Sequence, residues 1–204
     1  MCIPKWTRST HPADFRPITL LNTVNKILAR IIASKIRPAL EELLRTSQYC
    51  GVPGKIFEAV ANVKDAITNA EVAQIHICVL SLDFKEAFDK ISHTYPFTIL
   101  QNYGFFDVFI ERIKEMYDNA ASVVQINRHF SCPTPIPCSV RQGCLLSMLL
   151  FALCLTLLLH RMEQHLGGIW IHRRQKSGAV AYADHDTIFV TAPEDISATS
   201  DAIQ

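Results

Sequence analysis

Two aspartates stand where the sequence predicts that an apolar strand ends. The run Ile77–Leu80 predicts a buried strand that leads to Asp83. Asp184 lies between two further apolar runs, Ala179–Tyr182 and Thr187–Val190, which also predict strands. If these strands are neighbours, both carboxylates point into one place, and carboxylate oxygens are the ligands that Mg²⁺ prefers in proteins. Each aspartate also has a purely structural explanation, because Asp is a favoured helix N-cap and a common residue of hairpin turns.

His185 and Asp186 follow Asp184 in the predicted turn and differ from it chemically. An imidazole is a poor magnesium ligand and is better suited to zinc, copper or iron. We do not expect Asp186 to act as a second carboxylate, because a displacement of one residue in a hairpin turns the side chain the other way. Metal-dependent hydrolysis through His160, His165 and His185 is disfavoured, since His160 and His165 lack the i, i+4 spacing of a zinc pair.

Helical patterns surround these strands. The residues after Asp83 place a set of apolar side chains on one helix face, namely Phe84, Ala87, Phe88 and Ile91. The apolar run Leu145–Leu159 has fifteen residues, fewer than the ~20 that cross a bilayer, which favours a core helix over a membrane span. The order of helices and short strands predicts an α+β domain in which helices cover an antiparallel sheet.

The composition predicts a folded domain and gives no charge signal for a partner. The chain has 204 residues, of which 49% are hydrophobic and 19% charged, and its net charge is +1. A basic excess, which is usual in proteins that bind nucleic acid, is missing. Seven cysteines without zinc-site spacing indicate reduced thiols. With no signal peptide or transmembrane segment predicted, we expect an intracellular protein, cytoplasmic or nuclear, that does not contact membranes.

Five segments together resemble the reverse transcriptases (RNA-directed DNA polymerases) of non-long-terminal-repeat, LINE-type retrotransposons. Phe15–Asn22 is similar to the fingers motif of that family, and Gly51–Gly54 to the loop that follows it. Leu82–Asp89, Val140–Ser147 and Ala181–His185 resemble its first, second and third catalytic blocks. The order and spacing agree over residues 4–195, which is nearly the whole chain.

This resemblance implies the fold of a right-hand polymerase. Within one reverse transcriptase domain spanning residues 4–204, we expect a fingers-like region at 1–75 and a partial palm at 76–204, whose antiparallel sheet carries the catalytic blocks. We also expect the later palm segments and the thumb to be missing, since the chain ends soon after the third block.

The resemblance also implies a chemistry and a set of partners. The family copies an RNA template by extending a DNA primer with deoxynucleoside triphosphates, and two Mg²⁺ ions serve the reaction. Asp83 and Asp184 match the catalytic, metal-binding carboxylates. The positions that match nucleotide-binding residues are Arg16, Phe84, Phe88, Gln142 and Gly143.

Three of these assignments have structural alternatives. Phe88 matches the aromatic residue that excludes a ribose 2′-hydroxyl, and it also suits a hydrophobic core. For Gln142 the alternative is an ordinary surface position. Arg16, whose guanidinium suits a triphosphate, is equally able to pin its own loop.

Two positions depart from the family pattern. His185 stands where the family has a second aspartate, and Leu145 stands where it usually has a proline. The first departure removes about one negative charge from the expected metal site, so we expect impaired or absent polymerase activity. Alternatively, the chain is a non-catalytic retroelement remnant that binds nucleic acid or a protein partner. The sequence does not identify that protein partner.

Overall fold

The computed structural model of the chain describes residues 2–5, 7, 10–11, 14–44, 47–51, 54–126, 128–136, 138–171 and 175–203. Two residues of the predicted Gly51–Gly54 loop, Val52 and Pro53, lie outside these ranges. The chain forms two units, one made of Met1–Ala33 and Glu86–Ser147 and the other of Ser34–Lys85 and Met148–Gln204. The expected division into a fingers-like region and a palm at residue 75 stays a prediction.

The described part of the first unit contains short strand pairs and three helices that lie wholly within it. β1 (Cys2–Pro4) pairs with β2 (Phe15–Pro17), and two small ribbons follow later in the chain. In these ribbons β4 (Ala121–Ser122) pairs with β7 (Thr134–Pro135) and β5 (Gln125–Ile126) with β6 (His129–Phe130). The helices are α3 (Ala87–Lys90), α4 (Thr94–Asn102) and α5 (Asp107–Tyr117). Helices α4 and α5 pack together through fully buried aliphatic side chains, namely Ile99, Leu100, Ile110 and Ile113.

The second unit contains the elements that carry the two aspartates. Its helices are α2 (Lys55–Ala73) and α7 (Pro193–Ile203), and its strands are β3 (Cys78–Asp83), β8 (Ile169–Ile171), β9 (Gln175–Ser177), β10 (Ala179–Tyr182) and β11 (His185–Val190). Two longer helices, α1 (Thr23–Leu43) and α6 (Leu145–His165), begin in the first unit and end in the second.

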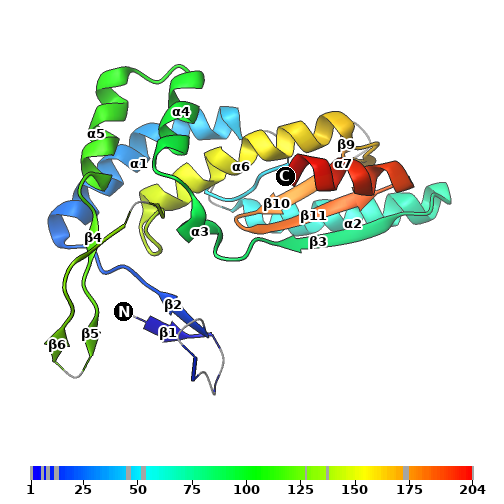
Figure 1. Cartoon of the computed structure of the whole chain (residues 1–204). Helices are drawn as coiled ribbons and strands as arrows, with labels where there is room; N and C mark the ends of the chain where they lie inside the picture. The colour runs from blue at the N-terminus through cyan, green and yellow to red at the C-terminus, as the bar shows by residue number, and fades with distance from the viewer. Residues whose placement is uncertain are drawn as a thin grey trace. The chain divides into compact units, whose positions relative to one another are not determined.

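A three-stranded antiparallel sheet in the order β10-β11-β3 forms the centre of the second unit. Figure 1 shows these strands with α2 running along them. On the face toward α2, Val180 and Phe189 pack in one cluster with Ala66 and Ala70. On the opposite face, Ala181 and other side chains of β10 and β11 are also fully buried. β10 and β11 therefore bury side chains on both of their faces, as in a sheet that is covered on both sides.

Two local predictions around Asp83 are wrong. The strand was expected to be buried, but β3 forms the edge of the described sheet, and its residue Val79 is 41% exposed to solvent. The helix was expected directly after Asp83, but α3 begins only at Ala87, and its N-cap is Glu86. An N-capping role for Asp83 is therefore excluded in this structure.

The long apolar helix α6 has 21 residues and is therefore longer than its fifteen-residue apolar run, but it is buried as expected of a core helix. By length and composition it could cross a membrane, but 61% of its most apolar 18-residue stretch is buried inside the fold. Among the residues that the structure describes, it is the one helix that meets this test. Fully buried leucines such as Leu149 and Leu153 identify it as a core helix of this fold.

The cysteines whose side chains the structure describes are free thiols, namely Cys50, Cys78, Cys132, Cys138, Cys144 and Cys154. Cys50, Cys144 and Cys154 are buried, whereas Cys78 and Cys132 are exposed. Burial raises the pKa of the Cys50 thiol to about 11 and that of Cys154 to about 12, because the thiolate is poorly solvated inside the protein. Both groups are therefore unreactive thiols at neutral pH.

The chain combines helices with an antiparallel sheet, so it has the predicted α+β class.

Candidate metal and nucleotide site

Asp83, Asp184 and His185 lie together at one end of the three-stranded sheet. Their ligand atoms all lie within 4.8 Å of one another. His185 is the cross-strand partner of Asp83 in the register of β11 and β3. The Nδ1 atom of His185 lies 3.5 Å from Oδ1 of Asp83 and 3.6 Å from Oδ1 of Asp184. The structure thus brings together both predicted carboxylates and the position that departs from the family.

A tight hairpin turn holds Asp184 at this place. Tyr182 and His185 are paired, so only Ala183 and Asp184 form the turn between β10 and β11. Such two-residue turns need a positive φ, and Ala183 has φ 58° although it is not a glycine. The backbone N–H of Phe84 donates a hydrogen bond to the carbonyl oxygen of Asp184 at 3.2 Å. This bond ties the turn to the chain that leaves Asp83.

The cluster faces solvent. The side chains of Asp83 and His185 are 73% and 70% exposed, and that of Asp184 is 34% exposed. An open cluster of two carboxylates is accessible to a hydrated cation and to phosphate oxygens. The imidazole of His185 stands beside the same carboxylate oxygens that such a cation would need.

Asp186 lies on the other face of the sheet and is fully buried. Successive side chains of a strand point to opposite faces, so Asp186 points away from His185, as predicted. Both of its carboxylate oxygens lack a hydrogen-bond partner in the part of the chain that the structure describes. Burial, and secondarily the negative charge of Asp184, raise the pKa of Asp186 to about 7.

Four of the predicted nucleotide-binding residues belong to the first unit. Arg16 is exposed on β2, opposite Ile3, and Phe88 is half-buried in α3. Gln142 is half-buried, and its Nε2 atom donates a hydrogen bond to Oδ2 of Asp89 at 2.9 Å. The interpretation of Gln142 as an ordinary surface residue is therefore incomplete, because its amide is held by a carboxylate.

Gly143 follows Gln142 in a left-handed conformation with φ 89°. A Cβ atom at this position would lie 3.4 Å from Cγ2 of Ile18 and 3.5 Å from the carbonyl oxygen of Thr19. The N–H of Thr19 donates to the carbonyl oxygen of Gln142 at 3.0 Å. The segment after β2 therefore packs closely against this glycine loop.

We expect Gly143→Ala to lower the free energy of unfolding by about 1 kcal/mol, because alanine is strained at positive φ. Gly54→Ala is the matched control, since Gly54 has φ 80° and no atom within 4 Å of an added Cβ. Urea unfolding should show similar decreases in the free energy of unfolding for both variants. Only Gly143→Ala should weaken binding of a deoxynucleoside triphosphate. Equal nucleotide affinity of the two variants would contradict a role for this loop in nucleotide binding.

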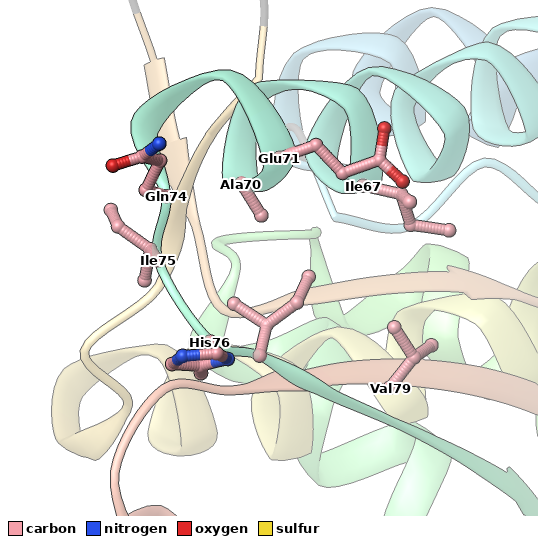
Figure 2. Close-up of a pocket in the computed structure, with 8 residues that line it drawn as sticks. Ile67, Ala70, Glu71, Gln74, Ile75, His76 and Val79 are labelled. Atoms are coloured by element: carbon pink, nitrogen blue, oxygen red, sulfur yellow. The ribbon is translucent and has the colours of Figure 1, made fainter.

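A groove in the second unit lies away from the acidic cluster. It has a volume of about 730 Å³ and is lined by Ile67, Ala70, Glu71, Gln74, Ile75, His76, Ile77 and Val79. Figure 2 shows these side chains between the C-terminal end of α2 and the start of β3. Asp83 is at the opposite end of the six-residue strand β3, roughly 15 Å away at the usual rise per residue. The groove is therefore separate from the candidate metal site.

Sequence reasoning assigned no functional contact to Asp89. It accepts hydrogen bonds from both Gln142 and Ser139. The sequence feature that could have pointed to Asp89 is its position directly after Phe88, in the segment that resembles the first catalytic block. The sequence does not show which distant segment lies opposite that carboxylate.

The sequence of this chain is similar to a protein-family model and to proteins of transposable elements. A family model described as reverse transcriptase (RNA-dependent DNA polymerase) matches residues 3–204. The transposon TX1 uncharacterized 149 kDa protein of Xenopus laevis is 34% identical over 179 residues, which are 87% of this chain and 14% of that protein. The retrovirus-related Pol polyprotein from type-2 retrotransposable element R2DM of Drosophila melanogaster is 25% identical over 81% of this chain and 16% of its own length. This chain thus spans only a small part of these relatives.

A solved structure of telomerase from Candida albicans, in complex with the TWJ fragment of telomeric RNA, is similar in fold. The match has a TM-score of 0.52 and 14% sequence identity, and it covers 88% of this chain and 31% of the telomerase chain. At this identity the match shows a shared fold alone.

Proposed function

This chain belongs to the reverse transcriptase (RNA-dependent DNA polymerase) family, among the domains of non-long-terminal-repeat retrotransposons, and we propose that Asp83 and Asp184 are its catalytic carboxylates. The observation that carries the proposal is the convergence of Asp83, Asp184 and His185 within 4.8 Å at the end of the sheet. We assign residues 76–204 to the palm and residues 1–75 to a fingers-like region.

The proposed reaction is extension of a DNA primer on an RNA template. The primer 3′-hydroxyl attacks the α-phosphate of a deoxynucleoside triphosphate, and pyrophosphate leaves. The two carboxylates fit Mg²⁺, because hard oxygen ligands suit this ion, whereas the imidazole of His185 does not. When bound, two Mg²⁺ ions would supply activation of the hydroxyl and charge neutralisation of the leaving group.

His185 is the residue that we propose impairs the site. It replaces a carboxylate at a position directly beside Asp83 in the sheet register. Its Nδ1 atom lies 3.5 Å from Oδ1 of Asp83 and 3.6 Å from Oδ1 of Asp184, so the imidazole occupies space beside the carboxylate oxygens that a cation would need. Both effects lower the affinity of the cluster for a divalent cation, so activity is expected to be weak.

The remaining predicted residues have roles toward the nucleotide. We propose that Arg16 pairs with the triphosphate through its guanidinium. Gln142 and Gly143 would contact the incoming nucleotide, and the backbone of Phe84 would lie beside the metal-binding carboxylates. Phe88 would exclude the 2′-hydroxyl of a ribonucleotide.

Phe88→Ala is expected to reduce the preference for deoxynucleotides over ribonucleotides by about tenfold, because a steric barrier to the 2′-hydroxyl is removed. Competition between a deoxynucleoside and a ribonucleoside triphosphate for binding to the chain measures this preference. Phe109→Ala, which truncates another half-buried phenylalanine in α5, should leave it unchanged. The role is rejected if both variants retain the preference of the natural chain.

Primer extension tests the proposed function. The natural chain, with an RNA template, a DNA primer, deoxynucleotides and Mg²⁺, should give slow synthesis that Asp83→Asn abolishes. Asp201→Asn is the matched control, since Asp201 is an exposed aspartate of α7 in the same unit. Robust, processive synthesis by the natural chain would contradict impairment, and synthesis that survives Asp83→Asn would contradict the catalytic assignment.

An exposed apolar helix face favours a second candidate function, which is binding of a partner without catalysis. In α1, Val24, Ile27 and Leu28 follow helical spacing and are 65%, 54% and 43% exposed. Such surfaces often mark sites of interaction. Salt-sensitive RNA binding together with no synthesis by either the natural chain or His185→Asp would support this function, and absence of binding at low salt would count against it.

A further inference from the structure

Asp89 is at the centre of a hydrogen-bond network in the first unit. Its Oδ2 atom accepts from Nε2 of Gln142 at 2.9 Å, and its Oδ1 atom accepts from the hydroxyl of Ser139 at 3.2 Å. These bonds are partly buried and join segments that are 50 and 53 residues apart in the chain. Hydrogen bonds to an ionised, partly buried carboxylate are among the stronger ones in proteins.

Backbone bonds run beside this network. The N–H of Val140 donates to the carbonyl oxygen of Phe88 at 2.8 Å, and the N–H of Ser139 donates to that of Ile91 at 2.9 Å. Ser139 has φ 107°, which is strained for a non-glycine residue. Such a conformation persists only when surrounding contacts impose it. The loop that carries Gln142 is therefore held against α3 at several points.

The chemistry of a carboxylate determines how the Gln142 amide is turned. An ionised Asp accepts hydrogen bonds but donates none, so only the Nε2 end of Gln142 can face Asp89. The Oε1 end, together with the second Nε2 proton, is then what Gln142 can offer to a ligand. An asparagine at position 89 would remove this constraint, because it could bind either end of the amide.

We propose that Asp89 is a positioning residue that acts through Gln142, fixing the amide so that Oε1 accepts a hydrogen bond from a donor group of the nucleotide. That donor is a sugar hydroxyl or a base N–H group, since the oxygens of an ionised phosphate only accept. The identity of the ligand rests on the proposed function. The orientation of the amide rests on the contacts within the first unit alone.

Asp89→Asn tests the orientation, because it preserves size and the capacity to hydrogen-bond. In the chain labelled with ¹⁵N-glutamine, the side-chain amide resonances of Gln142 should shift in Asp89→Asn and stay in place in Asp118→Asn. Asp118 is an exposed aspartate in the same unit, and its variant controls for loss of charge. Hydrogen exchange of the backbone amides of residues 139–144 should remain as in the natural chain. Unshifted Gln142 resonances in Asp89→Asn would overturn the proposal whatever the chain binds.

The affinity for a fluorescent deoxyguanosine triphosphate in the presence of Mg²⁺ tests the consequence. Asp89→Asn should weaken binding about three- to tenfold, which is the usual effect of one misplaced hydrogen bond. The same substitution in a Gln142→Ala background should cause no further loss, as expected for residues that act as a unit. Additive losses would overturn the proposal. Failure of the natural chain to bind the nucleotide would instead overturn the proposed function, while the amide resonances still decide the role of Asp89.

Discussion

His185→Asp is expected to raise primer extension at saturating Mg²⁺ by about tenfold or more. The new carboxylate would stand beside Asp83 in the register of β11 and β3, at the end of the sheet where Asp184 also lies. It adds a hard oxygen ligand and removes an imidazole that faces both aspartates. Because the site is largely exposed and screened by solvent, the expected gain is modest for a full charge. The rate of extension as a function of Mg²⁺ concentration measures it.

His185→Asn separates the two causes of this gain. Asparagine removes the imidazole but adds no carboxylate. We expect it to give a small part of the increase produced by His185→Asp. Equal rates for His185→Asn and His185→Asp would show that the missing carboxylate is not the defect.

Asp186→Asn is expected to stabilise the fold at pH 8 by on the order of a few kcal/mol. Asp186 is fully buried without a partner for either carboxylate oxygen among the described residues, and its pKa is raised from 3.8 to about 7. Between these two values the folded state keeps a proton that the unfolded state has lost. The natural chain therefore loses stability as the pH rises from about 4 through 7 and reaches a plateau above it.

Urea unfolding between pH 5 and pH 8 measures this effect. The difference between Asp186→Asn and the natural chain should grow with pH, because asparagine does not titrate. Asp201→Asn, the exposed control in the same unit, should follow the natural chain throughout. Parallel pH profiles of Asp186→Asn and the natural chain would show that Asp186 is ionised inside the fold at little cost.

The strand and turn that carry the two aspartates were predictable because their signals are local. An apolar run that ends on Asp83 and two apolar runs around Asp184 define three strands by composition alone. The opposite orientations of His185 and Asp186 follow from the alternation of a strand and needed no structure. The family assignment rests on segments that are each readable in sequence, and the family model matches residues 3–204.

What the sequence did not predict depends on partners far along the chain. Exposure of β3 depends on which strand stands at the edge of the sheet, and its own apolar residues do not encode that order. The apolar spacing after Asp83 suggested a longer helix, but the chain first makes a turn in which Glu86 has φ 58°. The bond between Asp89 and Gln142 joins two catalytic blocks, and neither block reveals the other as its neighbour.

Binding of Mn²⁺, followed by electron paramagnetic resonance, tests the central claim most directly, because it reports on the carboxylate pair without requiring synthesis. Mn²⁺ prefers the same oxygen ligands as Mg²⁺. The natural chain should bind Mn²⁺ weakly, with Kd on the order of 1 mM, as is usual for sites with few charged ligands. Asp83→Asn and Asp184→Asn should each abolish this binding, and His185→Asp should tighten it. Binding that is unaffected by loss of either aspartate would contradict a metal site at Asp83 and Asp184.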